Sequence, residues 1–573
     1  MGRLGKYIRP YWGYIILTVL IKTVASVMDL FIPYLMEMIL DDKVPAGDTR
    51  GIYICGGLMF LCAALCLGGN ILANRMSAIS SGKITRKLRH DLFEKLQHLS
   101  ARQMDELTIP SAESRLTSDT YNVNQLLNRI QRMAIRAPIL LVGGAIMMLM
   151  MDATLALVLI SLLPIIGIVV YFVTKTSVPL YTRQQTVLDR VVRTVQENIT
   201  GIRIIKALSK TDHEKKRFNE VNSELTTIDM KAGLITTITN PVATLVLNLG
   251  LTLVVVLGAR RVNHGQIESG VIVAFLQYFT IMLNAMLFVT RIFIMWSKGE
   301  ASAKRVADVL ELPEDMAVAV LEEAVAEDAP HIEFKDVCFS YTGIGKNIDS
   351  LSFTLEHGQT LGILGPTGCG KSTVINLLLR LYDPDSGCIR IDGQDVRTIP
   401  YDELRKKFGV VFQNDFMAEG TIGENIRFFR ELEQQELLRA AEHAQAGFIY
   451  EKEGQLDAPV MVRGNNLSGG QKQRLLIARA LAAKPEILIL DDASSALDYR
   501  TDANLRKALR QNYRDTTTVV VAQRISSLRH ADLILVLQDG AVIGAGNHDK
   551  LMESCNEYRI IAETQMGDGR EGA

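Results

Sequence analysis

Six long apolar segments in the first half of the chain constrain its fold more than any other feature of the sequence. They cover residues 14–40, 51–73, 138–151, 153–173, 234–258 and 271–296. Most of them reach the roughly 20 residues that an α-helix needs to cross the hydrocarbon core of a bilayer. The third is short, but only Asp152 separates it from the fourth, so Asp152 is expected to mark a tight hairpin between two spans. The sequence therefore predicts six membrane-spanning helices.

Basic residues orient these spans and define two long connections, residues 74–137 and 174–231. The first carries Arg75, Lys83, Arg86, Lys87, Arg89 and Lys95, and the second carries Lys206, Lys210, Lys215, Lys216 and Arg217. By the positive-inside rule both connections are cytoplasmic, and so is the N-terminus. Both have a helical pattern, and a helix of about 25 residues extends roughly 40 Å beyond the bilayer. Such arms are expected to contact a cytoplasmic partner or domain.

Composition excludes one large class of partners. The 573 residues include 62 basic and 63 acidic ones, a formal net charge of -1, which lacks the basic footprint of a nucleic-acid-binding protein. The seven cysteines are odd in number and form no metal-ligand pairs, so they are interpreted as free thiols. No nucleic-acid partner is expected.

The second half of the chain has the pattern of a soluble α/β domain. We assign residues 1–311 to the membrane domain, 312–330 to an acidic linker, 331–565 to the α/β domain and 566–573 to a tail. The segments IRIDG and LVLQDGAV carry Asp-Gly pairs typical of hairpin turns. The run ILIL before Asp491 is apolar at every position, as expected for a strand that is covered on both faces.

A phosphate-binding loop follows the apolar strand TLGIL and precedes a helical pattern. It consists of Gly365, Pro366, Thr367, Gly368, Cys369, Gly370, Lys371, Ser372 and, opening the helix, Thr373. Glycines allow successive backbone N–H groups to converge on phosphates, and the lysine reaches the β and γ groups. Ser372 and Asp491, at the end of the ILIL strand, are candidate ligands of the Mg²⁺ shell. The pattern predicts binding of ATP with Mg²⁺.

A second motif, Leu467-Ser468-Gly469-Gly470-Gln471, together with the phosphate loop, gives the chain its resemblance to ATP-binding cassette (ABC) transporters. The segments SRLTSD (114–119) and ENITGIRIIKAL (197–208) resemble the intracellular loops of ABC exporters, so the resemblance covers nearly the whole chain. It implies a domain-swapped dimer with six helices per subunit and a cytoplasmic P-loop cassette. Coupling helices are expected near residues 105–111 and 203–210.

The resemblance also implies roles for single residues. Tyr341 is similar to the aromatic residue that stacks on adenine, Gln413 to the Q-loop ligand of Mg²⁺, and residues 495–498 to the D-loop. Ser468, Gly469, Gly470 and Gln471 would bind the γ-phosphate of the nucleotide held by the opposite subunit. Without the family pattern, Tyr341 could simply pack in the sheet and Gln413 could be a solvated loop amide.

Two residues depart from the family pattern. Asp492 stands where ABC ATPases usually place the glutamate that polarises the attacking water, and Gln523 replaces the switch histidine. The aspartate is one methylene short, and a misplacement of about 1 Å can reduce a rate on the order of a hundredfold. Glutamine carries neither a proton nor a charge. We therefore expect this chain's own site to bind ATP but to hydrolyse it weakly, as in the degenerate-site subunit of bacterial heterodimeric multidrug-type exporters.

The function expected from this resemblance is ATP-driven export of an amphipathic substrate, such as a drug, lipid or peptide, across the plasma membrane. The partner would be a second ABC half-transporter of a different kind. A homodimer with two slow sites and an ATP-gated regulator or channel stay open as alternatives. Asp29 and Arg291 lie within the spans. Charged side chains are energetically unfavourable in the hydrocarbon core unless they pair with each other or face a cavity. They could form an ion pair, or Asp29 could favour a cationic substrate.

Overall fold

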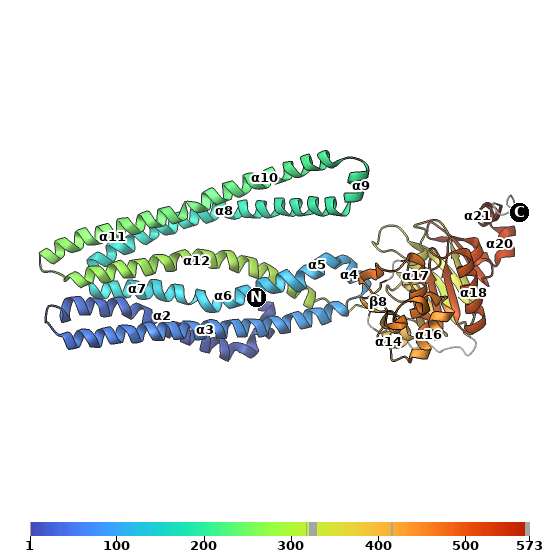
Figure 1. The fold of residues 1–573 in the computed structure, drawn as a ribbon, viewed down its shortest axis with the longest axis horizontal. Coiled ribbons are helices and arrows are strands. Elements are labelled where there is room, and N and C mark those ends of the chain that lie inside the picture. The colour runs from blue at the N-terminus through green and yellow to red at the C-terminus, as the bar shows by residue number, and fades with distance from the viewer. Residues whose placement is uncertain (1, 314, 317, 320–328, 414–415, 568–573) are drawn as a thin grey trace. The chain divides into compact units, whose positions relative to one another are not determined.

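The structure is a computed structural model that describes residues 2–313, 315–316, 318–319, 329–413 and 416–567. The chain forms two units (Figure 1). One unit comprises Met1–Gln97 and Ile109–Leu312, and the other comprises His98–Thr108 and Pro313–Ala573. Residues His98–Thr108 thus lie with the second unit, although they come from the first cytoplasmic connection.

The first unit is helical and contains the spans that the sequence predicts. Six helical segments of the described residues are long and apolar enough to cross a membrane: Gly5–Lys43, Thr49–Gln97, Ile109–Met151, Ala153–Thr200, Thr211–Asn263 and Ser269–Met286. The main helices that contribute to them are α2 (Trp12–Met38), α3 (Thr49–Gln97), α6 (Thr120–Arg129), α7 (Arg136–Met151), α8 (Ala153–Thr200), α10 (Thr211–Thr237), α11 (Thr239–Asn263) and α12 (Ser269–Leu310), which continues beyond the last span. The predicted number of spans is confirmed.

The helices of this unit pack in two groups. α2 pairs with α3, and α12 packs on α2 and α7, whereas α8 packs mainly on α10 and α11 (Figure 1). The hydroxyl of the buried Tyr278 donates to the Leu30 carbonyl over 2.7 Å and so joins α12 to α2. Asp152 forms the predicted hairpin, because its carboxylate accepts from the Leu155 N–H over 2.8 Å and caps α8.

Both cytoplasmic connections end in short helices. The first turns through α4 (Ala101–Leu107) into α5 (Ile109–Ser114), and the second through α9 (Ile202–Ala207) between α8 and α10. α4 begins with a capping box in which the Ser100 hydroxyl accepts from the Gln103 N–H over 3.2 Å. The reciprocal bond runs from the Ser100 N–H to Gln103 Oε1, so two otherwise unpaired backbone donors are satisfied.

The second unit is an α/β cassette with two main sheets. A six-stranded sheet has the order β12-β11-β3-β10-β9-β6, and a four-stranded antiparallel sheet has the order β2-β1-β4-β5. The strands of the first are β3 (Thr360–Leu364), β6 (Phe408–Val411), β9 (Ile487–Asp491), β10 (Thr517–Val521), β11 (Leu533–Gln538) and β12 (Ala541–Gly546). Those of the second are β1 (Ile332–Phe339), β2 (Ile348–Leu355), β4 (Ser386–Ile391) and β5 (Gln394–Asp395). Every residue of β9 is buried, as its unbroken apolar run predicts.

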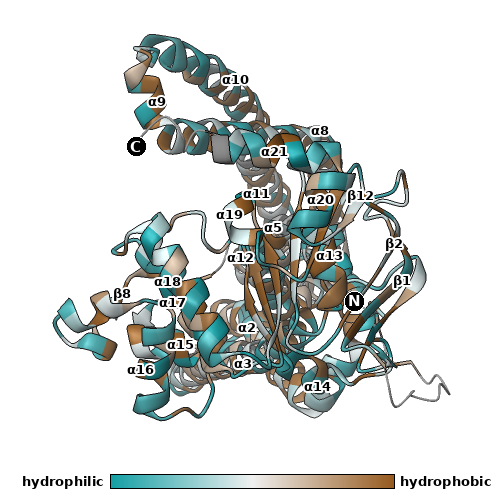
Figure 2. Cartoon of the chain, turned by 90° about the vertical axis from the view of Figure 1, so that its right-hand side faces the viewer, coloured by the Kyte–Doolittle hydropathy of each residue, from teal (hydrophilic) through white to brown (hydrophobic). Residues whose placement is uncertain are grey.

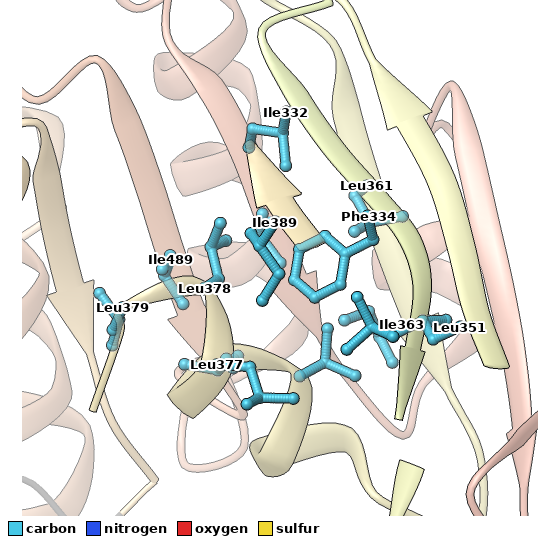
Figure 3. Packing of buried hydrophobic residues seen from close by; sticks show 14 of the residues in the cluster. Ile332, Phe334, Leu351, Leu361, Ile363, Leu377, Leu378, Leu379, Ile389 and Ile489 are labelled. Atoms are coloured by element: carbon cyan, nitrogen blue, oxygen red, sulfur yellow. The ribbon is translucent and has the colours of Figure 1, made fainter. Parts of the chain in front are cut away.

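The cassette helices cover these sheets and turn polar faces outward. They include α13 (Lys371–Leu378), α16 (Gln434–His443), α17 (Gly469–Ala482), α18 (Tyr499–Asn512), α20 (His548–Ser554) and α21 (Asn556–Gly567). Strands are mostly hydrophobic and the outer faces of α16 and α18 mostly hydrophilic (Figure 2). Between the two sheets lies a core in which Leu377 and Leu378 of α13 are buried among Phe334, Ile389 and Ile489 (Figure 3). This core holds the start of α13 at the end of β3.

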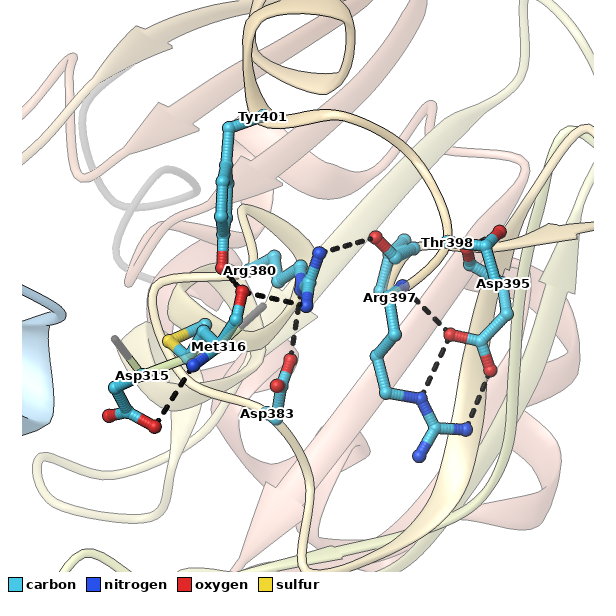
Figure 4. A network of polar contacts seen from close by, with 9 residues as sticks. Asp315, Met316, Arg380, Asp383, Asp395, Arg397, Thr398 and Tyr401 are labelled. Atoms are coloured by element: carbon cyan, nitrogen blue, oxygen red, sulfur yellow. Dashed lines mark hydrogen bonds and ion pairs between the residues drawn. The ribbon is translucent and has the colours of Figure 1, made fainter. Parts of the chain in front are cut away.

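A buried arginine anchors the described part of the linker to the cassette. Arg380, which is 1% exposed, donates to the carbonyls of Met316 and Val396 and to Asp383 (Figure 4). Tyr401 also donates its hydroxyl to the Met316 carbonyl. Because a buried guanidinium is stable only when its donors are satisfied, Met316 is fixed where the chain enters the cassette. Residues 320–328 of the predicted linker lie outside the described part of the chain.

Candidate functional site

The loop between β3 and α13 adopts the backbone that phosphate binding requires. Gly368 has a φ of 87° and Gly370 a φ of 106°, values that residues with a side chain rarely adopt. A Cβ on Gly370 would also lie 2.8 Å from the Asn347 carbonyl oxygen. The loop therefore needs glycine at position 370 for both its conformation and its packing.

Lys371 and Ser372 lie at the first turn of α13. The Lys371 ammonium donates to the carbonyls of Gly365 and Pro366 over 2.8 Å each, so it is held across the loop. The Ser372 hydroxyl donates to the Asp491 carboxylate over 3.2 Å. The two predicted Mg²⁺ ligands, which are 119 positions apart in the sequence, are thus in direct contact.

The environment of Asp491 suits a bound cation. The residue is 5% exposed, and burial raises the pKa of its carboxyl, with the neighbouring Asp492 acting in the same direction. Ser372 and Lys371 act in the opposite direction and lower that pKa. A divalent cation would favour the ionised carboxylate, so the residues present fit Mg²⁺.

These residues line one cavity of about 180 Å³. Its walls are Thr367, Gly368, Gly370, Lys371, Ser372, Thr373, Gln413, Asp491, Asp492, Val521 and Gln523. Most of the residues that the sequence assigns to the nucleotide and the metal therefore meet at one place. Gly365 and Cys369 belong to the same loop without lining the cavity, and Tyr341 and Ser468–Gln471 lie outside it.

Asp492 and Gln523, the two departures from the family pattern, face the same cavity. Asp492 follows β9 with a φ of 52°, and its N–H donates to the Val521 carbonyl over 3.0 Å. Gln523 follows β10, and its carbonyl accepts from Gln565 over 2.9 Å. Because β9 and β10 are parallel neighbours, the residues after them come together at one edge of the sheet.

Tyr341 lies after β1 in a group of three aromatic rings. Its ring contacts those of Phe339 and Tyr382 at centroid distances of 4.8 Å and 5.0 Å, and its hydroxyl accepts from Asn376 over 3.0 Å. Tyr382 in turn donates to Asp105 of α4. The aromatic group is thus continuous with α4, where Arg102 also pairs with Asp385 over 3.9 Å.

The motif Leu467–Gln471, here called the signature segment, forms the start of α17. Ser468 is its N-cap and forms a capping box with Gln471, with distances of 3.3 Å and 3.0 Å. Gly470 would place a Cβ 3.1 Å from the Ala496 carbonyl oxygen, so the D-loop lies directly against this helix terminus. Ser468 and Gly469, at this helix terminus, are exposed.

Two residues with a clear positioning role are not apparent from the sequence. Gln473 of α17 binds the D-loop through Ser495 Oγ at 3.0 Å and the Ala496 N–H at 2.9 Å. Arg479, 7% exposed, donates to the carbonyls of Phe416 and Asn425 and so ties α17 to the segment after Gln413. Both act over long sequence separations, and only their place in the signature helix could have indicated them.

The membrane unit contains a second polar cavity, of about 460 Å³. It is lined by Lys22, Asp29, Asn70, Asn74, Arg132, Met133, Arg136, Ala137, Leu140, Ile281, Asn284, Ala285 and Phe288. Asp29 forms an ion pair with Arg136 at 2.8 Å. The suggested pairing of Asp29 with Arg291 involves a side chain outside the described residues. Since Arg136 neutralises Asp29, the reason to expect a cationic substrate is removed.

Comparison with known proteins agrees with this geometry. Residues 15–286 match the family model of the ABC transporter transmembrane region, and residues 348–495 match the ABC transporter model. An uncharacterized ABC transporter ATP-binding protein of Bacillus subtilis, YfiB, is 34% identical over 100% of both chains. The chain belongs to the ABC transporter family. It is a multi-pass plasma-membrane protein with a cytoplasmic cassette.

Other relatives of this ABC transporter are similar over their full length. An uncharacterized ABC transporter ATP-binding protein of Mycobacterium tuberculosis is 32% identical, covering 99% of this chain and 98% of the relative. Among solved structures, a bacterial Atm1-family ABC exporter with ATP bound is similar with a TM-score of 0.80 over 99% of both chains, at 23% identity. The fold of this ABC transporter is thus that of the exporter structures.

Proposed function

We propose that this ABC transporter is one subunit of an ATP-driven exporter that moves an amphipathic substrate out of the cytoplasm or the inner leaflet. The observation that carries the proposal is the phosphate-loop cavity with its Ser372–Asp491 contact in a chain with six membrane spans. Lys371 would bind the β- and γ-phosphates of ATP, and Ser372, Gln413 and Asp491 would ligate Mg²⁺ directly or through water. Tyr341 would stack on the adenine.

Hydrolysis at this chain's own site is expected to be weak. Asp492 and Gln523 line the same cavity as Lys371, which supports the interpretation that both departures act on one γ-phosphate. The Asp492 carboxylate is one methylene shorter than the usual glutamate, and general-base catalysis needs the base within about 3.2 Å of the proton it accepts. ATP would therefore stay bound at this site while the competent site hydrolyses its own ATP.

A second subunit would complete the transporter. Ser468 and the glycines after it lie outside this chain's cavity, which is consistent with their serving a nucleotide on the partner. The second arm ends, at α9 and the residues beside it, in exposed apolar side chains: Ile199, Ile204 and Leu208 are 63–69% exposed. Exposed apolar clusters of this kind mark interaction surfaces, and here the occupant would be the partner's cassette.

The cavity of the membrane unit indicates the chemistry of the substrate. Its described lining residues include three basic ones, Lys22, Arg132 and Arg136, and one carboxylate, Asp29. Lys22 and Arg132 donate to Asn70 and Asn74, at 2.5 Å and 2.9 Å, so their charges are not neutralised by acids there. Leu140, Ile281 and Phe288 form an apolar side. An amphipathic molecule with an acidic group fits this lining better than a cation.

The test is transport by the purified complex in proteoliposomes with Mg-ATP. The probe is a fluorescent amphipath with one carboxylate, beside its neutral methyl ester. The proposal predicts ATP-dependent accumulation of the acid against its gradient, reduced at least tenfold by Arg132→Gln and retained by the matched control Arg129→Gln. Nucleotide binding without accumulation of any probe would favour an ATP-gated regulator or channel instead.

A further inference from the structure

Three turns meet at one edge of the cassette, away from the phosphate loop. His331 precedes β1, His357 lies in the turn between β2 and β3, and Asp392 lies in the β4–β5 hairpin turn. The sheet register explains their meeting, because Ile332 pairs with Leu355 on one side and with Ile391 on the other. In antiparallel pairing, the residue before Ile332 must lie level with the residues after Leu355 and Ile391.

The three side chains direct donor atoms at one point. His331 Nδ1 lies 2.5 Å from His357 Nδ1 and 2.9 Å from His357 Nε2. It also lies 3.3 Å from Asp392 Oδ1, and His357 Nε2 lies 3.1 Å from that same oxygen. A tetrahedral Zn²⁺ with bonds of about 2.0–2.1 Å separates its ligand atoms by about 3.3 Å. The observed triangle is therefore close to one face of such a coordination shell.

The hydrogen bonding within the triangle is incomplete. A proton can join the two imidazoles, but Asp392 Oδ1 is buried and accepts no hydrogen bond from the described residues. His331 is fully buried, and an imidazole binds a metal ion in its neutral form. A cation at the centre would satisfy the carboxylate oxygen and both imidazole lone pairs.

The surroundings orient the carboxylate. Lys407 Nζ lies 3.1 Å from Asp392 Oδ2, the other carboxylate oxygen, and pairs with Glu486 at 2.5 Å. Asp392 thus presents Oδ1 to the histidines, and Glu486 offsets the charge of the lysine. Contacts of this kind behind the ligands typically change metal affinity 10- to 100-fold.

We propose that His331, His357 and Asp392 bind a divalent transition-metal ion, with Zn²⁺ the best match, at a site separate from the Mg²⁺ site. Two imidazoles favour such an ion over Mg²⁺ and Ca²⁺, which prefer oxygen ligands. The fourth position would be open to water, since the His357 side chain is 64% exposed. The ion would link the start of β1, directly after the linker, to the β2–β3 turn and the β4–β5 turn of the cassette.

The experiment is a Zn²⁺ titration of the full complex, purified without a histidine tag, treated with chelator and followed by calorimetry. The proposal predicts one strong equivalent per copy of this chain, a higher melting temperature with the ion, and a visible absorption band of tetrahedral Co²⁺. His357→Ala and Asp392→Asn should each weaken binding at least tenfold, whereas His530→Ala, an exposed histidine of the same cassette, should bind as wild type does.

Two outcomes would overturn the proposal. No binding by the wild type would mean that the triangle is only a hydrogen-bonded cluster, and equal binding by His357→Ala would place the ion elsewhere. The exposed group His90, Asp91 and Glu94 also brings three donors together, so a His90→Ala background removes that source of Zn²⁺ binding. ATP binding by His357→Ala, measured in parallel, shows that the cassette is folded.

Discussion

At the scale of single residues, Lys371 is proposed to bind the nucleotide, whereas Asp492 and Gln523 would act in its hydrolysis. Lys371→Ala removes the ammonium that spans the loop carbonyls and should reduce ATP occupancy at this chain's site by at least tenfold. Hydrolysis by the assembled complex should stay measurable, because the partner's site would carry most turnover. Occupancy and turnover are measured on the same sample. Loss of all turnover with unchanged occupancy would contradict this division of roles.

The sequence predicts much of this site because its chemistry is local. A glycine-rich loop between a strand and a helix specifies its own conformation, so Gly368 to Ser372 lie where the pattern predicts. Asp491 could be predicted because an apolar strand ends there. Gln473 and Arg479 could not, because their partners, such as Ser495 and Phe416, are determined by how α17 packs in the cassette.

At the scale of elements, the N-terminus of α17 is expected to act on the partner's nucleotide. Ser468→Arg should stop transport more completely than any change at Asp492, because a large cation there would block closure on the partner's ATP. The substitution also removes an N-cap, which costs about 1 kcal/mol. The matched control is Asn547→Arg, which removes the N-cap of α20. Transport near the wild-type rate in Ser468→Arg would contradict this placement.

Helices and hairpins could be predicted best where their sequence pattern is long or local. Contacts between segments that lie far apart in the chain could be predicted least. The six spans and the Asp-Gly hairpins follow from local sequence: Ile391 pairs with Gln394 and Gln538 with Ala541 across those turns. The strand order of the six-stranded sheet does not follow from local sequence. Strand β3 lies between β11 and β10, and both of these strands come more than a hundred residues later in the chain. The association of α4 with Tyr382 and Asp385 likewise depends on contacts between distant segments.

At the scale of the whole molecule, we propose that this subunit binds ATP while a different subunit hydrolyses most of it. A tag on this chain should therefore co-purify a second ABC half-transporter of similar length. That partner should carry glutamate and histidine where this chain has Asp492 and Gln523. Recovery of this chain alone as an active dimer would favour a homodimer with two slow sites.

The most direct test is the ATPase rate of the assembled complex carrying Asp492→Asn in this chain. We expect a rate within about twofold of wild type, since the Asp492 carboxylate would contribute little as a general base. Replacing the partner's corresponding glutamate with glutamine should abolish most hydrolysis. If Asp492→Asn alone removes nearly all ATPase activity, this chain's site is catalytic and the asymmetric account is wrong.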